Sequence, residues 1–134
     1  MGLMDQFEEL TKDIQRSYEE GVTVEEAERL AGKFLHAQIM VSEEYRKADL
    51  DARMRKAGVK SVRAAVYMTN ATKTDKKPSD TYLEAIINMD ELVLGEQRAL
   101  DEAEVLVDQL RTYLSVFKEA HIHFRSIAKG AMNG

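Results

Sequence analysis

The sequence predicts an all-α protein: a long helical hairpin with a short helix and a basic loop between its two long helices. Only one proline and seven glycines occur among 134 residues, and the aromatic share is a low 7%. Few helix breakers and many good helix formers favour helices over sheet. Apolar residues also recur at intervals of three and four along most of the chain, which is the spacing of one helix face. The length suits one domain and is short for two, so we expect a single helical domain over residues 1–134.

A short N-terminal amphipathic helix is expected within residues 1–20. Phe7, Leu10 and Ile14 have the spacing of one helix face. Gly21 then interrupts the pattern, so the helix should end before it.

The first long helix is expected over residues 23–57. Thr23 and Glu26 have the spacing of a capping box, in which the threonine side chain accepts a hydrogen bond from the first turn. Gly58 supplies a plausible stop. Within this range four apolar residues recur at every seventh position: Ala27, Phe34, Val41 and Ala48.

Residues 58–78 are expected to form a basic connector that contains a short helix. The segment Val59–Met68 fits either a helix face or a strand, because its valines suit both. The segment Thr69–Pro78 is polar and rich in turn-forming residues, so it should be a mobile loop.

Residues 79–130 are expected to be helical, with Ser79 as the first cap and a break at residues 88–90. The clearest periodicity of the chain lies in the last part, where apolar residues alternate in steps of three and four. This apolar face is wider than a two-stranded contact needs, so we expect it to assemble copies of the chain into a homo-oligomer. The expected oligomer seam consists of Leu100, Val107, Leu110, Leu114, Phe117, His121 and Phe124.

Charge is distributed unevenly along the chain. Residues 46–77, here called the basic island, contain ten lysines and arginines and three aspartates, a net charge of +7 within a chain of net charge -5. Everything outside the island therefore sums to -12. Such a split localises affinity for a polyanion to one stretch.

Cations that neutralise phosphates release condensed counterions, so the basic island predicts salt-dependent and largely sequence-independent binding of nucleic acid. Two tyrosines bracket the core of the island and could stack unpaired bases, which favours a single strand. The alternative is that the cations form a solvated helix face and pair with Glu43, Glu44, Asp49 and Asp51. The candidate DNA-binding residues are Tyr45, Arg46, Arg53, Arg55, Lys56, Lys60, Arg63, Tyr67, Lys73, Lys76 and Lys77.

Other kinds of site have little support in the sequence. His121 and His123 lie two apart and would point to different faces of a helix, so no metal site is expected. No nucleophile, phosphate-loop or dinucleotide motif occurs, so we expect no catalytic residues, no enzymatic activity and no cofactor. Cysteine is absent, the N-terminus lacks the pattern of a signal peptide, and no stretch is apolar enough to span a membrane. We expect a cytoplasmic protein.

Four short stretches resemble the UvsY-like recombination mediators of tailed phages, and the resemblance extends along nearly the whole chain. They are Glu8–Asp13, Lys33–Leu35, Leu50–Met54 and Ala85–Asp90. The family's stretch corresponding to Leu50–Met54 is linked to single-stranded DNA binding. Arg53 matches that stretch, Asp51 stands where the family has a lysine, and Arg55 and Lys56 follow directly.

The resemblance implies a protein that binds single-stranded DNA and helps load a RecA-like recombinase where a single-strand-binding protein already sits. It also implies that identical subunits assemble into a ring. If a phage encodes the protein, the expected location is the host cytoplasm. Two rival interpretations stay open at this point. One is a structural helical oligomer, such as a phage scaffold, and the other is an adaptor whose acidic helix docks a protein.

Overall fold

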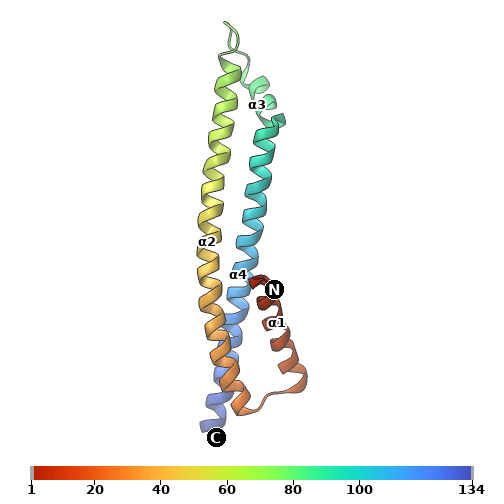
Figure 1. Cartoon of the computed structure of the whole chain (residues 1–134), viewed down its shortest axis with the longest axis vertical. Helices are drawn as coiled ribbons and strands as arrows, with labels where there is room; N and C mark the ends of the chain where they lie inside the picture. The colour runs from red at the N-terminus through yellow and green to blue at the C-terminus, as the bar shows by residue number, and fades with distance from the viewer. Residues whose placement is uncertain (1, 134) are drawn as a thin grey trace. The chain divides into compact units, whose positions relative to one another are not determined.

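The computed structural model describes residues 2–133, with side chains described for residues 2–130. This part of the chain contains four helices and no strand, namely α1 (Leu3–Glu20), α2 (Val24–Ala71), α3 (Asp80–Met89) and α4 (Glu91–Asn133) (Figure 1). The predicted all-α class is confirmed, as is the arrangement of a short helix and a loop between two long helices. Helix α3 and the connector before it lie between the two long helices in the order of the chain.

The helices belong to two compact units. Unit 1 comprises Met1–Tyr45 and Gln109–Gly134, and unit 2 comprises Arg46–Asp108. Both long helices contribute to both units, so the boundary falls inside α2 and inside α4. The sequence periodicity, from which we expect one helical domain, gives no sign of this division.

Unit 1 packs three helical segments around a cluster of aromatic rings. Phe7 of α1, Phe34 of α2, and Phe117 and Phe124 of α4 are each 0–1% exposed. The ring centres of Phe34 and Phe117 lie 5.6 Å apart, and those of Phe7 and Phe117 lie 5.8 Å apart. Aromatic pairs at such distances contribute beyond the area they bury, so this cluster is the main core of unit 1.

The turn between α1 and α2 follows the sequence prediction. Gly21 has a φ of 78° and its N–H donates to the carbonyl oxygen of Ser17, which ends α1. This left-handed conformation favours glycine. The Thr23 hydroxyl then accepts a hydrogen bond of 3.2 Å from the Glu26 N–H, which caps the start of α2.

The first long helix does not stop at Gly58. Helix α2 continues to Ala71, so the predicted range of 23–57 is too short and the predicted connector of 58–78 is too long. Among the described glycines, Gly21 alone has a positive φ, so Gly58 does not adopt a capping conformation. Val59 is only 6% exposed, and burying it against the rest of unit 2 outweighs the weak helix preference of valine. Tertiary packing thus settles the segment Val59–Met68 as helix.

The remaining connector, residues 72–79, leads into α3. The Ser79 hydroxyl accepts a hydrogen bond from the Tyr82 N–H, as predicted for a helix cap. At the other end, the Asp90 carboxylate accepts hydrogen bonds from the N–H groups of Leu92 and Val93. Asp90 therefore ends α3 and caps α4, which confirms the predicted break.

The heptad seam of α4 is used within the chain. Five of its members are 0–6% exposed: Leu100, Val107, Leu110, Phe117 and Phe124. Leu114 and His121 are half-buried, and the His121 imidazole lies 2.8 Å from the Ala31 carbonyl oxygen of α2. The chain's own helices cover these side chains, so a contact with a second copy has to use another surface. The expectation of an oligomer seam here is corrected accordingly.

Over the described residues, no helix contains an apolar stretch long enough to cross a membrane.

Candidate nucleic-acid interface

Five cations of the basic island line one side of α2 in unit 2. Arg46, Arg53 and Lys60 are spaced seven residues apart, which is almost two full helix turns, so they fall in one row. Lys56 and Arg63 form a second row beside it, also seven residues apart. At about 1.5 Å per residue the two rows together extend over roughly 25 Å. We call these five residues the basic stripe.

Arg55 does not belong to the basic stripe. It lies two residues from Arg53, which is about 200° around the helix. Its guanidinium Nε donates to the Asp51 carboxylate over 3.0 Å, on that other side. Arg55, one of the candidate DNA-binding residues, therefore lies on another side of α2 from the basic stripe.

Two members of the basic stripe form ion pairs. Arg53 lies 3.1 Å from the carboxylate of Asp49, and Arg63 lies 2.8 Å from that of Glu84 on α3. Arg63 also donates to the side-chain oxygen of Asn88 over 3.3 Å, so it helps to hold α3 against α2. Part of the alternative interpretation is thereby correct, because Asp49 and Asp51 do pair with arginines. Exposed pairs of this kind contribute only about 0–1 kcal/mol, so they leave the arginines available to a phosphate.

The other three members of the basic stripe, Arg46, Lys56 and Lys60, are exposed. No ion pair or hydrogen bond engages their side chains within the part of the chain that the structure describes. They give unit 2 an uncompensated positive surface. Lys73 and Lys76 add two more exposed cations in the connector after α2.

Tyr67 and Lys77 come together near the end of α2. The Lys77 ammonium lies 5.5 Å from the centre of the Tyr67 ring and 3.4 Å from the Asp80 carboxylate. The hydrogen bond with the Tyr67 hydroxyl, followed by the bond and charge of Asp80, raises the pKa of Lys77 above its usual value. One face of the Tyr67 ring is thus occupied by a cation.

Tyr45 lies in unit 1, where Arg111 of α4 is its partner. The guanidinium carbon of Arg111 lies 5.8 Å from the ring centre, and Nη2 donates to the tyrosine oxygen over 3.3 Å. Sequence reasoning did not include Arg111 among the candidate residues. A signal was present in the sequence, because Arg111 begins a second cation-rich stretch that also contains Lys118, Arg125 and Lys129.

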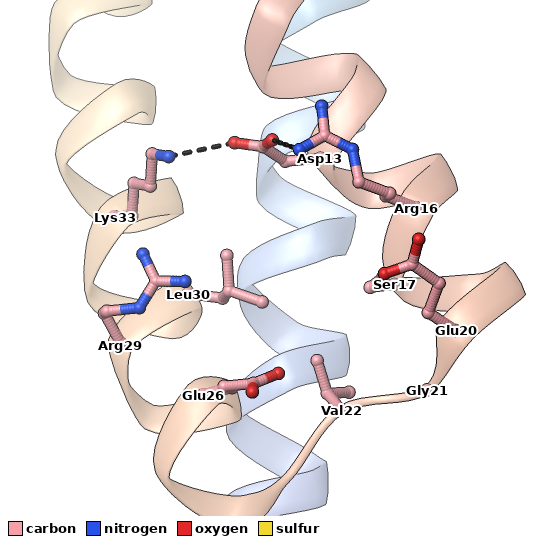
Figure 2. Close-up of a pocket in the computed structure, with 10 residues that line it drawn as sticks. All are labelled: Asp13, Arg16, Ser17, Glu20, Gly21, Val22, Glu26, Arg29, Leu30 and Lys33. Atoms are coloured by element: carbon pink, nitrogen blue, oxygen red, sulfur yellow. Dashed lines mark hydrogen bonds and ion pairs between the residues drawn. The ribbon is translucent and has the colours of Figure 1, made fainter.

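A separate pocket of about 340 Å³ lies in unit 1, between the end of α1 and the start of α2 (Figure 2). Figure 2 shows Arg16 and Lys33 both directed at Asp13, with distances of 3.5 Å and 2.9 Å. The Ser17 hydroxyl donates a hydrogen bond to the Ile14 carbonyl oxygen. The pocket mixes acidic and basic side chains.

The two C-terminal histidines point to different partners. His121 contacts Ala31 of α2, whereas the His123 ring stacks on Tyr18 of α1 with centres 5.2 Å apart. Over the described residues, no group of three metal-ligating side chains comes together.

Comparison with known proteins shows a similarity at the level of structure. No family model and no curated protein matches the chain. Among solved structures, the crystal structure of the bacteriophage T4 recombination mediator protein UvsY is similar, with a TM-score of 0.73. The match covers 100% of both chains at 16% sequence identity. The chain therefore has a UvsY-like fold.

Proposed function

We propose that this protein is a non-enzymatic recombination mediator that binds single-stranded DNA. It would help to load a RecA-like recombinase onto DNA where a single-strand-binding protein already sits. The observation that carries the proposal is the basic stripe, in which Arg46, Lys56 and Lys60 are exposed and unpaired within the described chain. The UvsY-like fold supports the same role.

The stripe can bind phosphates along an extended strand without reading its sequence. Each cation that neutralises a phosphate releases condensed counterions, and this gain does not depend on the base. Tyr67 and Tyr45 would add base stacking once Lys77 and Arg111 move off their rings. A homo-oligomer would present several stripes to one strand, so modest affinity at each copy would become avidity.

A structural oligomer without nucleic-acid binding is the second candidate. The ion pairs of Arg53 with Asp49 and of Arg55 with Asp51 favour it, because they neutralise two of the cations in the free protein. The unpaired members of the stripe favour the mediator.

Charge reversal separates the two candidates. The variant Arg46→Glu/Lys56→Glu/Lys60→Glu should lose binding to a labelled oligothymidine by at least 100-fold at low salt, and should fail to promote recombinase loading. The matched control is Lys118→Glu/Arg125→Glu/Lys129→Glu, which makes the same change of charge at exposed positions of unit 1. The control should retain most of the binding. Equal binding by the stripe variant and the wild type would overturn the proposal.

A further inference from the structure

The outward side of α2 in unit 2 carries an exposed apolar row. Its large members are well exposed, at 59% for Leu50, 67% for Met54 and 58% for Met68. The spacing alternates between four and three residues, which is typical of a helix that packs against another helix. We call this set the outer row, and it consists of Leu50, Met54, Ala57, Ser61, Ala64 and Met68.

The outer row is shaped for a close helix contact. Ala57, Ser61 and Ala64 are exposed and small, so a partner backbone can approach the middle of the row. Leu50 and Met54 at one end and Met68 at the other supply the larger side chains for packing. Exposed apolar surface arranged in this way marks a protein interaction site.

Nucleic-acid binding does not explain the outer row. Phosphates are bound by cations, and the basic stripe lies beside the row, with Arg46 and Arg53 at the shared edge. Lys56 and Arg63 lie farthest from the row, roughly 100° or more around the helix from Leu50. The row is therefore available to a protein while these cations stay open to phosphate.

Charge indicates which protein helix fits. Residues 46–63 of α2 contain seven cations and two aspartates, a net charge of +5. A second copy that presented the same face would bring +5 against +5. Residues 91–108 of α4 contain six acids and Arg98, a net charge of -5. The acidic segment of another copy is the complement that this chain itself supplies.

This acidic segment also carries an apolar row of its own. Leu92 is 71% exposed and Leu106 is 39% exposed. Gly95 and Ala99 between them are small and allow another helix backbone to approach closely, and Glu102 continues the same three- and four-residue spacing. We call this set the acidic row: Leu92, Gly95, Ala99, Glu102 and Leu106.

We propose that the outer row of one copy packs against the acidic row of a second copy. The two helices would run antiparallel, as closure of a head-to-tail ring requires. Leu50 would then pack against Leu106, Ala57 and Ser61 would lie over Ala99 and Gly95, and Arg53 would face Glu102. After one such contact, the first copy still has its acidic row exposed and the second copy still has its outer row exposed. Further copies can therefore add head-to-tail until the assembly closes into a ring. This proposal shares one element with the proposed function, namely that the protein forms a homo-oligomer.

Velocity sedimentation without nucleic acid tests the apolar part of the contact. The variant Leu50→Glu/Met54→Glu should shift the assembly toward monomer by at least tenfold in concentration. The control Ile122→Glu, at a residue 54% exposed in unit 1, should assemble like the wild type. Circular dichroism should show unchanged helix content in both variants. Wild-type assembly by the double variant, or a wild type that is monomeric at every concentration, overturns the proposal.

A charge swap tests the direction of the contact. Arg53→Glu and Glu102→Arg should each weaken assembly, and an equimolar mixture of the two should recover it. If Arg53→Glu strengthens assembly instead, two α2 faces meet and the proposal is overturned. Oligothymidine binding is measured separately. Loss of binding with assembly intact contradicts the proposed function alone, and binding by a monomeric chain contradicts the contact alone.

Discussion

The guanidinium group of Arg53 lies 3.1 Å from the carboxylate of Asp49, one turn earlier on α2. The arginine side chain is 77% exposed and the aspartate 33% exposed. Water screens such a pair, so it contributes about 1 kcal/mol at most. In the free protein Asp49 nevertheless holds a negative charge inside the basic stripe, where a phosphate would otherwise lie.

Replacing Asp49 should therefore strengthen DNA binding. Asp49→Asn removes a negative charge several ångströms from the phosphate path, which is worth about two- to threefold in affinity at low salt. Asp51→Asn is the matched control, because Asp51 also pairs with an arginine but lies on the other side of α2. Oligothymidine anisotropy measures both, and an equal gain for the two variants would contradict the placement of the stripe.

Gly58 should be replaceable, unlike Gly21. A Cβ at Gly58 would lie 3.5 Å from the Glu96 carboxylate, an ordinary contact, and alanine favours the helix by about 0.5–1 kcal/mol. Gly58→Ala should thus raise the midpoint of thermal unfolding. Gly21→Ala should lower it, because the φ of 78° at that position strains an L side chain. A lower midpoint for Gly58→Ala would show that the helix does not run through this residue.

Phe117 should be a key residue for the stability of unit 1. Its ring is fully buried and contacts the rings of Phe7, Phe34 and Tyr113. Phe117→Ala should lower the free energy of unfolding by about 3–5 kcal/mol in urea denaturation. Tyr18→Ala, at a ring 67% exposed, serves as the control and should cost about 1 kcal/mol or less. Similar losses for both variants would contradict the assigned core.

Lys77 should stay charged well into the alkaline range. Its raised pKa means that the folded state favours the ammonium, so this stabilisation is present below the ordinary value of 10.5 and is lost as pH rises through the folded pKa. Tyr67→Phe removes the leading hydrogen bond and should return the pKa toward 10.5. Side-chain ¹⁵N NMR of Lys77 measures this directly. A wild-type midpoint below 10.5 would rule out the contact with Tyr67.

Much of the fold could be predicted from local sequence patterns at the ends of the helices. The Thr23, Ser79 and Asp90 caps each depend on a side chain and a nearby N–H group, so spacing alone predicts them. The end of α2 could not be predicted in this way. Whether Gly58 stops the helix depends on what Val59 packs against, and that partner is distant in sequence.

The sequence predicts the candidate site only as a continuous stretch of residues. The structure shows which cations of that stretch share one surface. Charge counting located the basic island but not which cations share a side, so it did not show that Arg55 lies apart from the basic stripe. The seam of α4 was correctly identified as a packing face. Its partner was not, because periodicity does not distinguish a helix of the same chain, such as the one carrying Phe34, from a helix of another copy.

The salt dependence of oligothymidine binding tests the central claim most directly. If the four cations of the basic stripe other than Arg53 each neutralise one phosphate in the assembled protein, log affinity should fall against log salt with a slope of about -2.8 per subunit. The variant Arg46→Glu/Lys56→Glu/Lys60→Glu should reduce that slope by about 2. An absence of binding at low salt, or a slope that the variant leaves unchanged, would contradict the assignment of the stripe as the DNA-binding surface.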